Sequence, residues 1–171
     1  QYVYVAADYA FFNMSGGIGT GTGVASGSGS PLVPDGTIPA GQSFFVTSKN
    51  ANEFFDFTNS MRIGDPDKNN NFFKQANTKK SATIQKNRVW LNLTNAGGAF
   101  KQLLVGYITG ATNDVDKLYD GMSLGGNTYV DFYSVMNTNK MAIQGRGLPF
   151  DETDEVPLGY KTTIDGTFEI S

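Results

Sequence analysis

Apolar and polar residues alternate in short runs along this chain, which is the pattern of strands with one buried face. The runs are rich in aromatic and β-branched side chains, and clusters of Gly, Asn and Asp separate them. We predict strands at residues 2–5, 43–47, 53–57, 88–93, 101–108, 129–135, 140–144 and 167–170. No stretch has the period of a convincing amphipathic helix, and we expect only short helical turns, around residues 113–118.

Two segments are the most informative. Residues 86–121 read KNRVWLNLTNAGGAFKQLLVGYITGATNDVDKLYDG, and the TNAGGA stretch at 94–99 supplies the Gly and Asn that a tight reversal requires. We therefore predict a β-hairpin followed by an acidic, Asn-rich loop. Residues 148–160, LPFDETDEVPLGY, predict an acidic turn that leads into another strand.

The length of 171 residues predicts a single domain, 1–171, that is large enough to bury its own core. Short strands separated by Gly, Asn and Asp turns favour an all-β fold, an antiparallel β-sandwich of the jelly-roll or immunoglobulin-like type. Trp90 alternates with Val89 and Leu91 in the middle of a predicted strand, so we expect it to pack in the core or on a sheet face.

One low-complexity segment, GGIGTGTGVASGSGS at 16–30, predicts a long, flexible Gly/Ser-rich surface loop. Pro31, Pro34 and Pro39 extend this loop to residue 42. A phosphate-binding function is excluded because the segment lacks the G-x-G-x-x-G register and because no Lys follows it as a P-loop requires.

Composition excludes several classes of function. The chain has no Cys and no His, which removes disulfide frameworks, Cys-based zinc sites, thiol nucleophiles and every triad that needs an imidazole. Its 13 basic and 16 acidic residues give a net charge of -3, and the Lys residues are scattered, so we expect no nucleic acid partner. No apolar run approaches the ~18 residues of a membrane span, and no signal peptide is present, so we expect a soluble, mature or trimmed piece.

The first of three acidic clusters lies in DPDKNNN. Asp65, Asp67 and Asn69 have the alternating oxygen spacing of a calcium loop. However, Asn70 replaces the expected Gly, and Ala76 stands where the bidentate Glu belongs, which excludes an EF-hand. A solvated turn is the favoured interpretation of this cluster.

The second cluster lies in TNDVDKLYDG and is the candidate metal site. Asn113, Asp114, Asp116 and Asp120 can converge with backbone carbonyls on one hard cation, because calcium accepts six to eight oxygen ligands in flexible geometry. The alternative is that these side chains form Asx-turns and caps for the loop backbone. Calcium is thus the one candidate cofactor.

The third cluster consists of Asp151, Glu152, Asp154 and Glu155. Two carboxylates held across a sugar cleft can act as acid and base in glycoside hydrolysis. Because these four lie on one short segment between prolines, the favoured interpretation is that they keep a loop soluble or pair with Arg146.

Several strings also point to a known family. KNRVWLNLTNAGGAFKQLLVGYITGATNDVDKLYDG, GGNTYVDFYSV and AIQGRGLPFDETDEVPLGYKTTIDGTFEIS, preceded by DYAFFNMSGGIGTGTG, DGTIPAGQSFFVTS and FTNSMRIGDPDKNNNFFK, follow one another in order over nearly the whole chain. Together they resemble the region just upstream of the C-terminal sorting domain in large proteins that Bacteroidetes export by the type IX secretion system. The resemblance is strongest to Flavobacterium-like gliding bacteria.

The resemblance implies a place and a role. It implies an extracellular or outer-membrane surface location in a Gram-negative bacterium, with the secretion machinery as a partner during export. It implies a non-catalytic adhesin, a gliding-associated surface protein or a filament component. Upstream strands that the family usually has, with an NPYPS-like string and a YFW-type strand, are absent here, and the chain stops near where the removable sorting domain would begin. A sheet without those strands has an open edge, which another segment of the parent protein, a further copy or a partner can complete by strand addition.

Three functional hypotheses follow. The leading one is a non-catalytic β-sandwich module that acts in adhesion or assembly. The second is a carbohydrate-binding module of a secreted polysaccharide-degrading protein, since Tyr, Trp and Asn are residues that contact surface glycans. The third, and least favoured, is an enzyme that uses carboxylates alone.

Overall fold

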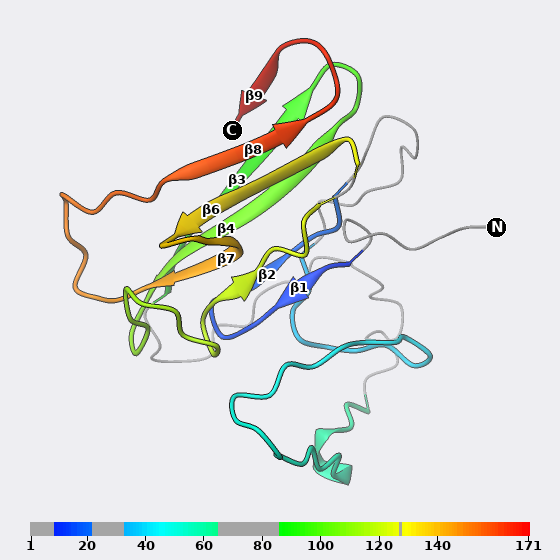
Figure 1. Cartoon of the computed structure of the whole chain (residues 1–171). Coiled ribbons are helices and arrows are strands. Elements are labelled where there is room, and N and C mark those ends of the chain that lie inside the picture. The colour runs from blue at the N-terminus through cyan, green and yellow to red at the C-terminus, as the bar shows by residue number, and fades with distance from the viewer. Residues whose placement is uncertain (1–8, 22–32, 65–85, 127) are drawn as a thin grey trace.

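The computed structural model describes residues 9–21, 33–64, 86–126 and 128–171. The predicted strand at 2–5, the turn of Asp65, Asp67 and Asn69, and residues 22–32 of the low-complexity loop lie outside the described residues. The strands are β1 Phe11–Phe12, β2 Gly17–Ile18, β3 Lys86–Asn95, β4 Phe100–Ile108, β5 Gly121–Met122, β6 Val130–Met136, β7 Asn139–Arg146, β8 Leu158–Thr162 and β9 Phe168–Ile170 (Figure 1). The all-β prediction is confirmed: the helical element in the described part is one 3-10 turn, Asn59–Met61.

Seven of the strands form one sheet in the order β8-β6-β7-β4-β3-β9, with β5 paired to β7 beside this path. All of these pairs are antiparallel except β4 with β7, which run parallel. The purely antiparallel arrangement predicted from the sequence is therefore corrected at the centre of the sheet. The physical reason is coverage on both faces: β4 is buried from Lys101 to Gly106 and β7 from Met141 to Gly145, as expected for central parallel strands.

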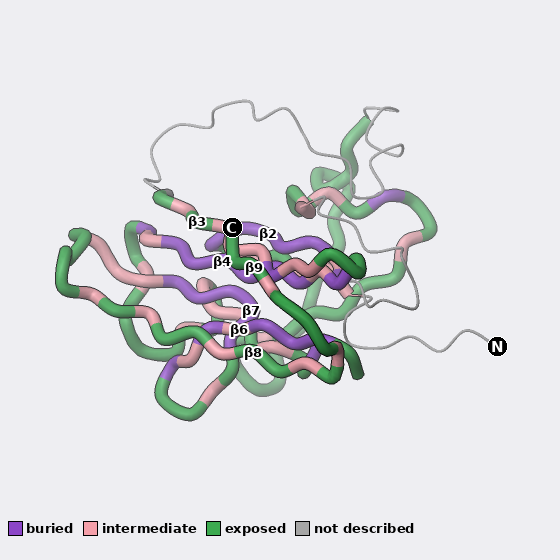
Figure 2. Tube along the Cα trace, turned by 90° about the horizontal axis from the view of Figure 1, so that it is seen from above, coloured by how far each residue is buried: buried purple, intermediate pink, exposed green. Residues whose placement is uncertain are grey.

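The sheet curls around its main hydrophobic cluster, which gives it a sandwich-like cross-section. The buried members of this cluster come from β3, β4 and β6 and from the turn between β3 and β4: Leu93, Ala99, Leu103, Val105, Val130 and Phe132. The curl brings the two end strands together, because the rings of Tyr160 on β8 and Phe168 on β9 lie 6.5 Å apart. Figure 2 shows the buried positions concentrated in β2, β4, β6 and β7, while the beginning of β3 is more exposed.

The convex face of the sheet is covered by the small β1–β2 hairpin. Ile18 of β2 is fully buried and packs with Leu104 and Ile143. Trp90 joins this cluster and its Nε1 donates a 3.0 Å hydrogen bond to the Gly17 carbonyl, which confirms its predicted packing on a sheet face. The predicted flexible loop 16–42 is thus wrong at its beginning. Glycine is used there for close approach, since a Cβ on Gly17 would lie 2.5 Å from the Pro34 carbonyl oxygen.

The β-hairpin predicted around the TNAGGA turn at 94–99 is confirmed. β3 and β4 pair from Lys86 opposite Ile108 to Thr94 opposite Phe100. Asn95 closes the turn twice, because its N–H donates to the Ala99 carbonyl and its Oδ1 accepts from the Ala99 N–H at 2.9 Å. Gly98 has φ +90°, the conformation that favours glycine.

The predicted strands at 43–47 and 53–57 are wrong. Residues 33–64 contain no strand, and the phenylalanines of these two ranges are all exposed, with Phe45 at 85% and Phe54 at 93%. The alternating pattern is real, but a strand forms only where a neighbouring strand accepts its backbone hydrogen bonds. Throughout the described ranges, no helix combines the length and the apolarity needed to cross a membrane.

Candidate functional site

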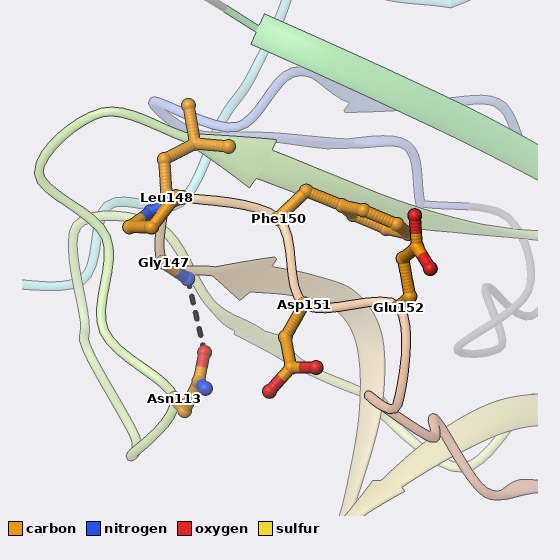
Figure 3. Close-up of a pocket in the computed structure, with 7 residues that line it drawn as sticks. Asn113, Gly147, Leu148, Phe150, Asp151 and Glu152 are labelled. Carbon is orange, nitrogen blue, oxygen red and sulfur yellow. Dashed lines mark hydrogen bonds between the residues drawn. The ribbon is translucent and has the colours of Figure 1, made fainter.

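The two acidic segments singled out in the sequence meet at the end of β7. The Gly145 N–H donates to Asp120 Oδ1 at 2.7 Å, and the Gly147 N–H donates to Asn113 Oδ1 at 3.0 Å. Loop 109–120 is therefore fastened to the chain that leaves β7, and residues 147–157 follow directly. Figure 3 shows the Asn113 contact beside the turn that carries Leu148, Phe150, Asp151 and Glu152.

In the predicted cation loop, carboxylate oxygens accept hydrogen bonds from backbone N–H groups of the same loop. Asp120 Oδ2 accepts from the Asp116 N–H at 2.6 Å, and Asp116 Oδ1 accepts from the Leu118 N–H at 3.0 Å. The Asp120 N–H donates to the Asp116 carbonyl at 2.7 Å, which closes a turn, but residues 113–118, where short helical turns were expected, contain no helix. Burial raises the pKa of Asp120. This arrangement is the Asx-turn and capping alternative.

No group of three or more carboxylates that could hold a metal ion occurs among the described residues. Of the four predicted ligands, Asn113 and Asp120 are brought to β7 and Asp116 caps its own turn, whereas the backbone carbonyl of Asp114 accepts from the Thr112 hydroxyl at 3.0 Å. The calcium site stays a prediction, and the hydrogen bonds of the loop argue against it.

The third acidic cluster supplies an ion pair. The guanidinium of Arg146 binds both carboxylate oxygens of Asp154, with Nε 2.9 Å from Oδ2 and Nη2 on Oδ1, and both side chains are only 12% exposed. Tyr107 donates its hydroxyl to the same Oδ2 at 2.8 Å. The predicted pairing with Arg146 is confirmed. Arg146 holds the pKa of Asp154 below its ordinary value, and burial raises the pKa of Tyr107.

A shallow hollow lies beside this ion pair. Its lining residues are Asn113, Gly147, Leu148, Pro149, Phe150, Asp151 and Glu152. Phe150 is 60% exposed, and its ring lies 5.0 Å from the Tyr107 ring in an edge-to-face arrangement. Sequence reasoning missed Phe150, although an aromatic residue between a proline and an acidic turn was the available signal.

The second unusual surface is the edge of β3. β9 covers only the C-terminal part of this strand: Leu93 to Asn95 pair with β9, and Asn92 exchanges two hydrogen bonds with Ser171, at 2.8 and 3.0 Å. From Lys86 to Leu91, β3 is paired with β4 on one side, and no described residue pairs with the other side. Val89 in this stretch is 52% exposed. We call residues 86–91 the open edge.

Comparison with known proteins gives one result. A family model described as a domain of unknown function, DUF8693, matches residues 1–171. The chain belongs to this family. No curated protein and no solved structure matches the chain. The DUF8693 description names no activity.

The ion pair predicts a stability effect. Asp154→Asn is expected to lower the free energy of unfolding by about 2 kcal/mol at pH 7, because it leaves a poorly exposed guanidinium without its charged partner. Urea unfolding followed by circular dichroism measures this loss. Glu155→Gln, which removes an exposed neighbouring carboxylate, is the matched control and is expected to change stability little. Equal stabilities of the two variants would contradict the ion pair's role.

The same variant predicts a change in pH dependence. The pKa of Asp154 is depressed below 3.8 in the folded state, so its contribution is present above that value and is lost as the pH falls through the folded pKa. The difference in melting temperature between the original chain and Asp154→Asn is therefore expected to shrink as the pH falls from 5 to 2. A difference that stays constant over this range would show that Asp154 is not ionised in the folded state.

Proposed function

We propose that this chain is a non-catalytic binding module of an exported cell-surface protein, which acts in adhesion or filament assembly. The observation that carries the proposal is the open edge of β3. No described residue pairs with the outer side of residues 86–91, and six residues is about the length of a typical strand. Strand addition at such an edge joins proteins through main-chain hydrogen bonds and needs no catalytic residue.

From Val89 to Leu91 the open edge lacks the usual protection against pairing. Natural sheets blunt their edges with proline, with bulges or with charged side chains, and the stretch KNRVWL has no proline. Its Arg88 is turned away from the edge, because Nε donates to the Ser15 carbonyl on the convex face at 2.5 Å. Val89 and Leu91 leave partly exposed apolar surface on the concave face. An exposed, regular and apolar edge of this kind is a binding surface or an aggregation hazard.

Two further observations support the proposal. The carboxylates of Asp120 and Asp154, which an acid or base would need to keep free, are engaged with backbone N–H groups and with Arg146. The resemblance to type IX-exported proteins supports an extracellular or outer-membrane surface location, with gliding-associated display as one setting. The engaged carboxylates and the resemblance together favour a module that binds other molecules.

Retention of beads under flow tests this function. Beads that carry the domain are drawn over a bare surface, a polysaccharide-coated surface and a surface coated with denatured casein, which offers extended polypeptide segments. We expect retention on casein. Retention on no surface would contradict an adhesive or assembling function.

A second candidate function, carbohydrate binding, is favoured by the hollow. Sugars are bound by an exposed aromatic ring with polar groups near it, and Figure 3 shows the ring of Phe150 extending toward Glu152, while Asn113 and Asp151 line the other side of the hollow. The Asn113 Nδ2 donor and the Glu152 carboxylate supply groups of both hydrogen-bonding kinds, since the hydrogen bond that holds Asn113 to a described residue uses Oδ1.

Affinity electrophoresis in gels that contain plant or bacterial polysaccharides tests this candidate. If the hollow binds glycans, the domain is expected to be retarded and Phe150→Ala to remove most of the retardation, because the aromatic platform is lost. Phe12→Ala, which truncates an exposed phenylalanine elsewhere, is the matched control. Equal migration of all three proteins with and without polysaccharide would dismiss the carbohydrate function.

A further inference from the structure

The side chains that line the hollow offer more hydrogen-bond acceptors than donors. Asp151 uses Oδ1 for the N–H and the hydroxyl of Thr153, at 2.8 and 2.7 Å, and its Oδ2 has no partner among the described residues. The Glu152 carboxylate is exposed and accepts no hydrogen bond within the described part of the chain. The side-chain donor of the described lining is Asn113 Nδ2, because Oδ1 of this residue binds the Gly147 N–H. A ligand that satisfies this lining therefore brings mostly donors.

The ring of Phe150 is held beside these acceptors by a chain of contacts. Asp154, which is paired with Arg146, accepts the Tyr107 hydroxyl at 2.8 Å. The Tyr107 ring in turn lies edge-to-face against Phe150, with the ring centres 5.0 Å apart. Phe150 is still 60% exposed, and Figure 3 shows its ring extending toward Glu152. An aromatic face next to a carboxylate attracts a cation, because the ring quadrupole and the negative charge act together.

The charge around the hollow is strongly negative. Loop 109–120 and residues 147–157 together carry seven carboxylates and one amine, whereas the whole chain has a net charge of -3. The carboxylates belong to Asp114, Asp116, Asp120, Asp151, Glu152, Asp154 and Glu155. The hydrogen bonds from Thr153 hold the pKa of Asp151 below its ordinary value, so this carboxyl is ionised at neutral pH. An anionic ligand is repelled here, and a cationic one is attracted.

The hollow has the dimensions of a small-ligand site. Its volume is about 830 Å³, which lies within the roughly 300–1,000 Å³ of common ligand pockets. A single lysine or arginine side chain placed against Phe150 and Glu152 would leave the polar atoms of Asn113 and Asp151 on the other side unpaired. A sugar ring covers the aromatic face and carries hydroxyl groups on both of its sides, and hydroxyl groups donate as well as accept. The arrangement therefore favours a sugar that also bears a positive charge.

We propose that the hollow binds amino sugars with a free, protonated amine. The sugar ring lies on Phe150, the ammonium group binds Glu152, and hydroxyl groups bind Asn113 and Asp151. This inference rests on the second proposed function, carbohydrate binding, and adds the class of sugar. Uronic acids and sulfated sugars are poor ligands for the same site, because their charge has the sign of the surrounding carboxylates.

Isothermal titration with matched oligosaccharides tests the proposal. The probes are the tetrasaccharide of glucosamine and the tetrasaccharide of N-acetylglucosamine, in which acetyl groups remove the positive charges. We expect saturable binding of the glucosamine tetrasaccharide and binding of the acetylated one that is weaker by about tenfold or more, since a charge-assisted hydrogen bond is lost. Equal affinities, or tighter binding of the acetylated probe, would overturn the proposal.

A pair of carboxylate variants locates the interaction. Glu152→Gln is expected to weaken binding of the glucosamine tetrasaccharide by about tenfold. Glu155→Gln is the matched control, because Glu155 is an exposed carboxylate of the same segment that does not line the hollow, and its affinity is expected to stay within about twofold of the original. Both positions are exposed, and circular dichroism checks that both variants fold. Equal losses in the two variants would show a general attraction to the acidic surface and overturn the proposal.

Further arms separate this inference from the function on which it rests. Tetralysine carries positive charges without a sugar ring, and binding as tight as that of the glucosamine tetrasaccharide would assign the hollow to a basic peptide and overturn the proposal. If neither tetrasaccharide binds but a neutral polysaccharide retards the domain in the gel, carbohydrate binding stands and the preference for an amine is wrong. If nothing binds and no gel retards the domain, both are wrong.

Discussion

Phe132→Ala is expected to lower the free energy of unfolding by about 4 kcal/mol, the usual cost of truncating a buried phenylalanine. Phe132 lies on β6, is 1% exposed, and belongs to the main hydrophobic cluster, around which the sheet curls. Truncation of the Phe132 side chain leaves a cavity among the residues of β3, β4 and β6 that form this cluster. Urea unfolding at pH 7 measures the loss. A domain of this size has a total stability of roughly 5–15 kcal/mol, so the variant is expected to retain its fold only marginally.

Phe54→Ala is the matched control for this effect. The side chain of Phe54 is 93% exposed, and the described structure gives it no place in either hydrophobic cluster. Its truncation is therefore expected to change the free energy of unfolding by less than about 0.5 kcal/mol. Similar losses of unfolding free energy in Phe132→Ala and Phe54→Ala would show that the main hydrophobic cluster is not the core of the domain.

Gly145→Ala is expected to destabilise the domain by about 3 kcal/mol, near the upper end of the usual cost of overpacking. A Cβ on Gly145 would lie 2.6 Å from Tyr119 Cβ and 3.2 Å from Ser15 Oγ. The added methyl group would push loop 109–120 away from β7 and disturb the hydrogen bond from the Gly145 N–H to Asp120. Thermal unfolding measures this effect. Gly64→Ala is the control, because nothing lies within 4 Å of its added Cβ and its φ is not positive. Two variants of equal stability would contradict the close packing of this loop on β7.

The sequence predicted the second half of the fold well. Strands β3, β4, β6, β7 and β9 coincide with alternating runs, and the turn at Asn95 follows from its Asn and Gly residues. In these strands the local pattern and the tertiary pairing agree. The residues at 43–47 and 53–57 carry an equally strong pattern, yet they have no strand beside them in the described structure. Periodicity records which face a strand would bury, and it cannot report whether a partner strand is present.

The candidate sites were predictable to different degrees. The pairing of Asp154 with Arg146 could be expected from two opposite charges near one turn. The use of Asp116 and Asp120 as caps was one of two alternatives, because the same acidic spacing serves a cation or a backbone turn equally well. The pairing of β3 with β9 could not be predicted, because it depends on which residue of β9 lies opposite Leu93. That choice is a property of the register between strands about 75 residues apart.

Amide hydrogen exchange of the free domain, followed residue by residue by NMR, tests the central claim most directly. We predict that the amides of Arg88 and Trp90, which face the open edge, exchange fast, while the amides of Val89 and Leu91, which face β4, are protected. If Arg88 and Trp90 are as well protected as Val89 and Leu91 in the free monomer, the edge is already covered, and the account of this module as an acceptor of a partner strand is wrong.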